Sequence, residues 1–330
     1  MADISPASRR ADRRLSPPKR SVAELIRGGT LDAELAATVW VLIDGRVPLV
    51  VASRENGMGA LALLHALLDL VPDDVRRIEL VGADERFAWL PQAPDLGWPR
   101  SSSPVVPARP DPSGRHDPSL RHDPPVRPET TVIVAPGLAG RDPSATGGPA
   151  VRIAVRAASI GYGLAATIEG DALEDVFATL ERAPVALGDD ELSRLGVVLV
   201  LRDVEPGDRP RVVAAHYVRP VARDEHGHVQ RLGPAVLATW DPAGDRFEHF
   251  GWGITPELAR RVGRRAGDFE LEVDRRRNLL AGLAAAGTEG VDAVRAAIDA
   301  DRAAQESARV ALDADHPTTN TFTQPAAAPN

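Results

Sequence analysis

The residues with the clearest chemical meaning lie in the segment 46–70, which reads RVPLVVASRENGMGALALLHALLDL. An apolar run over residues 47–52 is typical of a buried strand. It leads into a glycine-bearing turn and then into an apolar helix. A strand, a loop and a helix in this order form the setting of a phosphate-binding loop, whose pattern is G-x-x-x-x-G-K-[ST]. The segment therefore predicts a place where backbone amides at the start of a helix can hold an anion.

The loop departs from this pattern at the positions that contact phosphate. Arg54 and Gly59 occupy the two glycine positions, whereas Ala60 and Leu61 replace the lysine and the hydroxyl residue. The only lysine of the chain is Lys19, in a polar N-terminal segment, so no lysine of the folded region can supply the missing charge. The candidate nucleotide-binding residues are those of this degenerate loop: Arg54, Asn56, Gly57, Met58, Gly59, Ala60 and Leu61.

Composition excludes several classes of protein. The 330 residues allow one large domain or two small ones, and a hydrophobic content of 43% is ample for a core. A net charge of −8 argues against a general nucleic-acid binder, and the lack of cysteine rules out disulfides and thiolate metal sites. The sequence has no apolar run of membrane-spanning length and no apolar N-terminal segment, so we expect a cytoplasmic protein.

Strand-like and helix-like segments alternate over the first 205 residues, and this predicts an α/β fold with a mostly parallel, doubly wound sheet. Ser21 and Glu24 are spaced as a capping box at the start of the first helix. The strand over 47–52 is apolar on both faces, so we expect it to be central. The expected strands are 47–52, 77–81, 131–135, 164–168 and 195–202, and the expected helices are 22–27, 32–43, 60–70, 150–160 and 171–180.

The pattern changes after residue 208. Three strands of an antiparallel meander are expected at 211–218, 230–240 and 246–252, followed by helices at 255–263, 268–285 and 290–312. We therefore divide the chain into a disordered basic arm (1–20), an α/β core (21–205) with a flexible Pro-rich insertion (99–130), an antiparallel β-region (206–253), a helical region (254–312) and a disordered tail (313–330).

Four stretches together resemble the motor ATPases of type II/IV secretion, a family that includes the ATPases of Tad (Flp) pili and of archaeal pili and flagella. They are SVAELIRGGTLDAELAATVWVLID (21–44), VVASRENGMGALALLHALLDLVPDD (50–74), TVIVAPGLAG (131–140) and GYGLAATIEGDALEDVFATL (161–180). They are similar to the family's helix pair before the P-loop, its P-loop and helix, its Walker B strand, and its T-x-H-A box with the helix that follows. The resemblance covers residues 21 to about 201 and implies a RecA-like P-loop NTPase fold.

The departures from the family pattern extend beyond the P-loop. The Walker B acid falls on or near Pro136-Gly137, and the histidine of the T-x-H-A box falls on Glu169. Asp84 and Glu85, in VGADERFAWL, can match the acidic box that the family places between them. The resemblance thus carries three candidate catalytic residues to this chain, namely Asp84, Glu85 and Glu169.

ATP hydrolysis needs positive charge on the β- and γ-phosphates, a ligand for Mg²⁺ and a residue that orients water. Because Ala60 and Leu61 supply neither charge nor oxygen, we expect a non-catalytic homologue, a pseudo-ATPase, that needs no cofactor. The first alternative is a divergent ATPase that binds ATP and Mg²⁺ with an unusual phosphate site. The second is a metal-binding hydrolase in the β-region, which would use His216, His226, His228 and His249.

The expected partners follow from the resemblance, because ring ATPases of this family act as hexamers. We expect a homo- or hetero-oligomer with a secretion or pilus ATPase or with a membrane platform protein. Residues 1–20 carry six basic residues against two acidic ones, and such an arm can approach the anionic inner face of the cytoplasmic membrane. Nucleic acid is not an expected partner.

Overall fold

The computed structural model describes residues 19–54, 58–99, 126–140, 145–204, 210–223, 226, 229–230 and 232–315. Most of the basic arm, most of the Pro-rich insertion and the end of the tail lie outside the described residues. Asn56 and Gly57 of the degenerate loop and His228 of the β-region lie outside them as well.

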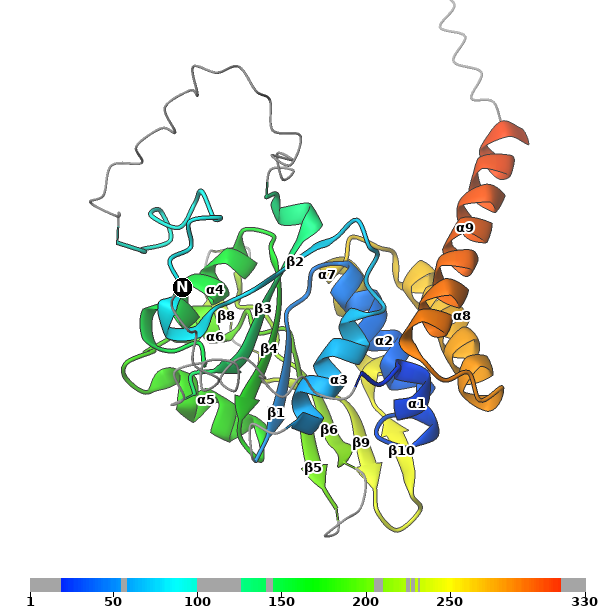
Figure 1. Ribbon diagram of the computed structural model, residues 1–330, viewed down its shortest axis with the longest axis horizontal. Coiled ribbons are helices and arrows are strands. Elements are labelled where there is room, and N and C mark those ends of the chain that lie inside the picture. Colours follow the sequence, from blue (N-terminus) through cyan, green and yellow to red (C-terminus); the bar gives the residue numbers. More distant parts are fainter. Residues whose placement is uncertain are drawn as a thin grey trace, which may run out of the picture.

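The fold is α/β, as predicted, and is built on one mixed sheet of eight strands (Figure 1). The strand order is β10-β9-β6-β5-β1-β4-β3-β2. The strands are β1 (Leu49–Ser53), β2 (Arg76–Glu79), β3 (Thr131–Leu138), β4 (Gly163–Glu169), β5 (Val197–Asp203), β6 (Pro210–Tyr217), β9 (Ala235–Asp241) and β10 (Arg246–His249). Strand β1 pairs in parallel with both β4 and β5, so the predicted central position of this strand is confirmed.

Helices cover both faces of the sheet. They are α1 (Val22–Arg27), α2 (Ala33–Asp44), α3 (Met58–Leu68), α4 (Gly148–Ser159), α5 (Leu173–Glu181), α6 (Asp189–Leu192), α7 (Thr255–Arg261), α8 (Ala266–Ala285) and α9 (Val291–Asp315). A first core joins Leu49 and Val51 of β1 to α1, α2, α3, α7, α8 and α9. A second core joins Val50 and Ala52 of the same strand to α4, α5 and α6. Successive residues of β1 thus face opposite layers, which explains why the strand is apolar throughout.

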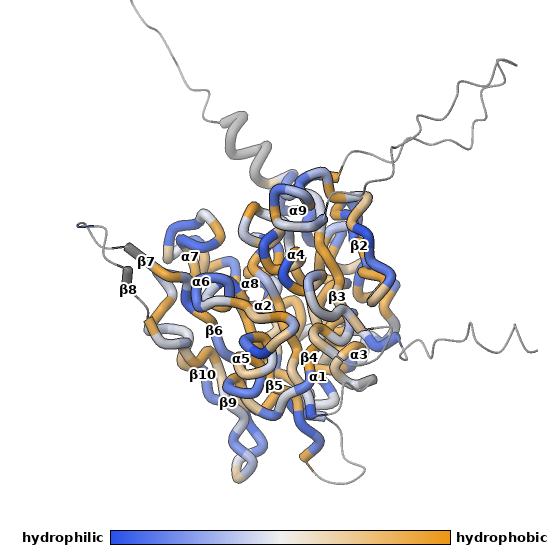
Figure 2. The backbone as a smooth tube through the Cα atoms, turned by 90° about the vertical axis from the view of Figure 1, so that its left-hand side faces the viewer, coloured by the Kyte–Doolittle hydropathy of each residue, from blue (hydrophilic) through white to orange (hydrophobic). Residues whose placement is uncertain are grey.

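Figure 2 shows hydrophobic residues gathered in the middle of the molecule and hydrophilic residues at the turns around it. In the described part of the chain, no helix combines the length and the apolar character that crossing a membrane requires.

The antiparallel region continues the central sheet, because β6 pairs with β5 and β9 pairs with β6. Two of its strands are shorter than predicted. The segment expected at 230–240 is divided, since Gly233 and Pro234 precede β9 and proline has no N–H to donate. Its first part, β8 (Val229–Gln230), pairs instead with β7 (Ala222–Arg223). The strand expected at 246–252 ends at His249, and the glycine-rich Gly251–Ile254 forms a 3-10 turn.

Candidate functional site

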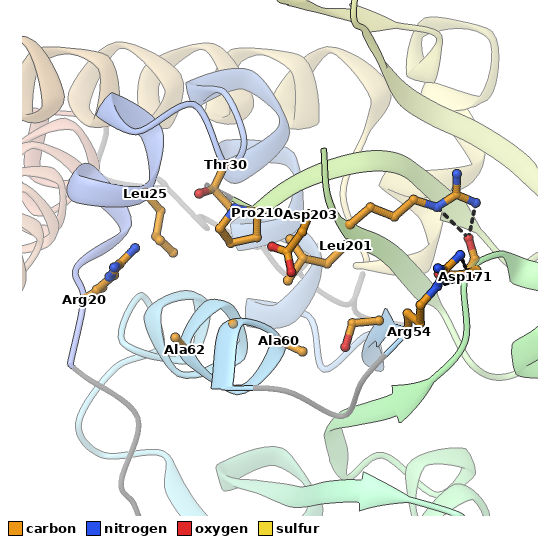
Figure 3. Close-up of a pocket in the computed structure, with 13 residues that line it drawn as sticks. Arg20, Leu25, Thr30, Arg54, Ala60, Ala62, Asp171, Leu201, Asp203 and Pro210 are labelled. Carbon is orange, nitrogen blue, oxygen red and sulfur yellow. Dashed lines mark hydrogen bonds and ion pairs between the residues drawn. The ribbon is translucent and has the colours of Figure 1, made fainter. Parts of the chain in front are cut away.

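A cavity of about 600 Å³ lies where the carboxyl ends of β1 and β5 meet the start of α3 (Figure 3). Its walls carry three arginines and two aspartates among small and apolar residues. They are Arg20, Leu25, Thr30, Ser53, Arg54, Gly59, Ala60, Ala62, Asp171, Leu201, Arg202, Asp203 and Pro210. In the view of Figure 3, Arg54 and Asp171 lie on one side of the cavity and Arg20 lies on the other.

The chain topology explains why the cavity forms at this edge. Strand β1 is followed by α3, which packs in the first core, whereas the neighbouring β4 is followed by α5, which packs in the second core. Connections that leave adjacent parallel strands toward opposite faces create a topological switch point, and ligands of open α/β sheets bind in the crevice there. The described ends of the degenerate loop, Arg54 and Gly59, are therefore located where this architecture places a binding site.

The start of α3 borders the cavity, and its described residues there carry no polar side chain. Ala60 is 1% exposed and lines the cavity with a methyl group. Leu61 packs against the first core. The amides of the first helical turn have no partner within the helix, so they can still hold an anion. Among the described residues of the degenerate loop, the start of α3 is present, and Ala60 and Leu61 stand at the lysine and hydroxyl positions.

Arg54 and Arg202 converge on Asp171, which follows β4. Arg54 donates from Nε to Oδ2 of Asp171 at 2.8 Å, and its side chain is otherwise 80% exposed. Arg202, at the end of β5, donates from Nε to the main-chain carbonyl of Asp171 at 3.1 Å. Two cations from neighbouring strands are therefore held by one residue, and the carboxylate offsets part of their charge.

The predicted catalytic residues do not meet at this cavity. Glu169 ends β4 beside Ser53 of β1, but it is exposed and does not line the cavity. Asp84 and Glu85 follow β2, and strands β3 and β4 separate β2 from β1 in the sheet. Glu169 is thus paired with the residue that precedes the degenerate loop, whereas Asp84 and Glu85 lie at the far edge of the sheet.

Glu85 has a different environment from the exposed Asp84. Its side chain is 5% exposed and accepts backbone N–H bonds from Val81 at 3.3 Å, Arg86 at 2.9 Å and Phe87 at 2.6 Å. A carboxylate that accepts three backbone bonds stabilises the turn that it caps. Glu85 therefore shapes this turn at the sheet edge.

The Walker B position also lacks an acid. Pro136 and Gly137 lie in β3, and the Gly137 N–H donates to Oγ1 of Thr167 at 2.8 Å. No group of three or more His, Asp or Glu side chains among the described residues could hold a metal ion.

Among the described histidines of the β-region, His216 and His249 are not assembled into one site. His249 Nε2 lies 2.7 Å from Oδ2 of Asp32, at the start of α2 on the first face. His216 instead interacts electrostatically with Glu174 of α5, on the second face, and burial lowers its pKa. His226 is exposed, and His228 lies outside the described residues. The two histidines placed within the main sheet therefore lie on opposite faces of it.

Sequence reasoning missed Asp171, Arg202 and Asp203, which line the cavity. Each follows or ends a strand that the apolar runs had located. The positions of these residues in the sequence could therefore have indicated them, because residues at the carboxyl ends of parallel strands gather at one edge of a sheet.

No protein-family model matches the chain, and none of the curated proteins compared with it is a match.

Proposed function

We propose that the protein is a non-hydrolysing relative of the type II/IV secretion and pilus motor ATPases, and that it acts as a structural or regulatory subunit. One observation carries the proposal. The cavity at the switch point is bordered by the start of α3, but Ala60 and Leu61 stand where a working loop needs a lysine and a hydroxyl.

The strand order supports a RecA-like core for this proposal. Five parallel strands follow the order β5-β1-β4-β3-β2, with the degenerate loop directly after the central β1. A strand that leads through a loop into a helix is the setting of a P-loop. The strand that the sequence resemblance assigns to Walker B is β3.

The degenerate loop lacks two side chains that a working P-loop uses in phosphoryl transfer. A charge-assisted hydrogen bond is worth roughly 1.5–3 kcal/mol, so the missing lysine alone weakens phosphate binding by about one to two powers of ten. Leu61 and Pro136-Gly137 supply no oxygen side chain for Mg²⁺. A protein that keeps the fold but loses these groups can still bind partner proteins in an assembly through its surface.

A hydrolysis assay tests the proposal. Phosphate release from Mg²⁺-ATP should equal the no-protein background, with or without the exposed Asp84→Asn change. Asp84 is preferable to Glu85 for this test, because Glu85 caps backbone amides and its loss would disturb the fold. Turnover above background in the unmodified protein would overturn the proposal, whether or not the Asp84→Asn change abolishes it.

One observation favours a divergent ATPase as the second candidate. Three arginines, Arg20, Arg54 and Arg202, line the cavity and could supply the charge that a lysine normally gives. In that case hydrolysis would be measurable in the unmodified protein and would fall sharply in Arg202→Gln. A protein with no turnover at all rules this candidate out.

The assembly role has its own test. We propose that the protein is held on the cytoplasmic side of a secretion or pilus assembly, by a related ATPase or a membrane platform protein, with the basic residues 1–20 near the membrane surface. Affinity capture from its native cells followed by size analysis should recover it with such a component. Recovery as a lone monomer of 35.1 kDa would contradict this role.

A further inference from the structure

A second cavity, of about 310 Å³, lies between the first turns of α2, the 3-10 turn after β10, and helices α7 and α8. It shares no lining residue with the cavity at β1. Its apolar lining includes Leu237, Leu258, Phe269 and Val273. We call it the α2–α8 groove.

Trp252 lines the α2–α8 groove and is 80% exposed. The residue lies in the 3-10 turn Gly251–Ile254, between two glycines. A tryptophan in this position leaves a large apolar ring in water, whereas such rings are usually buried. Its ring face is a favourable surface for a cation, since the quadrupole of indole attracts positive charge.

The other walls of the groove are acidic. Glu34 comes from α2, and Glu270 and Asp274 come from α8. Arg277 pairs with Asp274 at 3.0 Å and lies 3.8 Å from Glu34. Within the described part of the chain, Glu270 has no hydrogen-bond or ion-pair partner. The three carboxylates therefore outnumber the one arginine, Arg277, that lies beside them.

The pKa of His249, which also lines the groove, is consistent with the negative charge of the groove walls. Burial alone would lower its pKa, but the hydrogen bond to Asp32 and the charges of Asp32 and Glu34 raise the pKa above its usual value, against the opposing charge of Arg277. The electrostatic potential at the start of α2 is thus negative, and it favours a positively charged group there.

We propose that the α2–α8 groove docks an arginine-bearing segment of a partner protein. The aliphatic stem of the arginine lies on the apolar lining, its guanidinium stacks on Trp252, and Glu270 with Asp274 accepts its N–H groups. Arginine suits this combination better than lysine, because a planar guanidinium both stacks on aromatic rings and forms forked bonds to carboxylates. The acidic walls exclude an anionic membrane as the occupant.

The experiment uses the full chain and a synthetic peptide, acetyl-Gly-Arg-Gly-Arg-Gly-amide, in isothermal titration calorimetry. Saturable binding is expected, weakening as salt is added, while the matching glutamate peptide does not bind. Trp252→Ala should weaken binding by about threefold to fivefold, the range of an exposed cation–π contact. Glu270→Gln should weaken it by a similar factor, and Trp252→Phe should keep most of the affinity because the ring face remains.

The matched control is Glu306→Gln, which removes an exposed carboxylate of α9 that does not line the groove. This variant should bind the arginine peptide with the affinity of the unmodified protein. The circular dichroism spectrum of every variant should match that of the unmodified protein. Equal affinity of Trp252→Ala and the unmodified protein would overturn the proposal. Binding of spermidine at least as tightly as of the peptide would overturn the assignment to a protein segment.

Discussion

The guanidinium of Arg54 and the carboxylate of Asp171 form an ion pair beside the β1 cavity, with Nε 2.8 Å from Oδ2. The two residues are 117 positions apart in the chain and meet because β4 lies next to β1. The pair is largely exposed, so it adds little to stability. The pair affects anion binding instead, because any anion that enters the cavity competes with Asp171 for the guanidinium of Arg54.

The first prediction concerns Asp171→Asn. The change removes a negative charge beside Arg54, while the main-chain carbonyl that accepts from Arg202 is retained. Affinity for magnesium-free ATP, measured by calorimetry, should rise by up to about fivefold. Asp203→Asn is the matched control, since Asp203 lines the same cavity without an ion pair to Arg54 among the described contacts. Equal effects of the two changes would show that the ion pair does not govern access to Arg54.

The second prediction concerns pH. The folded-state pKa of His249 is raised by Asp32 and Glu34, despite burial and Arg277. Its stabilising contribution is therefore fully present below the unfolded pKa of about 6.5 and is lost as pH rises through the raised value. His249→Gln should lower the free energy of unfolding at about pH 5.5 by roughly 1.5–3 kcal/mol, the range for a charge-assisted bond, and by less at about pH 8.5.

Urea unfolding at the two pH values measures this difference. His216→Gln is the control, because burial lowers the pKa of His216 and its effect should have the opposite dependence on pH. A His249→Gln cost that is the same at both pH values would contradict the charged interaction with α2.

The third prediction concerns the attachment of α8 to the core. Arg276 is 6% exposed, lies 4.3 Å from the centroid of the Trp40 ring and pairs with Asp44 at 2.7 Å. Burial raises the pKa of the Asp44 carboxyl, and Arg276 offsets part of that rise. Arg276→Ala should lower the free energy of unfolding by about 1.5–3 kcal/mol, because it removes a charge-assisted bond from the half-buried Asp44, whose charge Arg46 and Arg302 offset only in part.

The neighbouring Arg277→Ala change is the control for Arg276. Its side chain is 38% exposed, so the cost in chemical denaturation should be below about 1 kcal/mol. The double change Arg276→Ala with Asp44→Asn should recover part of the lost stability, since the buried charge is gone. Equal small effects of Arg276→Ala and Arg277→Ala would mean that the pair does not anchor α8.

Much of the fold could be predicted because local patterns specify it. The capping box of Ser21 and Glu24 is present, with the Glu24 N–H donating to Oγ of Ser21 at 3.2 Å. The apolar run at 47–52 indicated a strand buried on both faces, and β1 is such a strand. These features depend on neighbours in the chain, so the sequence contains them directly.

The site could be predicted only in part, because it depends on strand order. Arg54 was expected at the loop. Its partner Asp171 was not, because nothing in the sequence indicates that β4 lies beside β1. Asp84 and Glu85 were expected to match the family's acidic box, and the structure places them after β2, at the far edge of the sheet. Long-range pairing of strands is not encoded in any local pattern, and this explains why Asp171 was missed.

We propose that the start of α3 retains backbone amides that can bind an anion, and that Ala60 and Leu61 account for the loss of nucleotide affinity. The most direct measurement is the affinity for Mg²⁺-ATP of the paired variant Ala60→Lys with Leu61→Thr. The matched control is Ala62→Lys with Leu61→Thr, which adds the same charge to the cavity wall away from the lysine position. We predict at least about a tenfold gain in affinity for the first variant over the control. Equal affinities of the two variants, or an unmodified protein that already binds and hydrolyses ATP, would contradict the account.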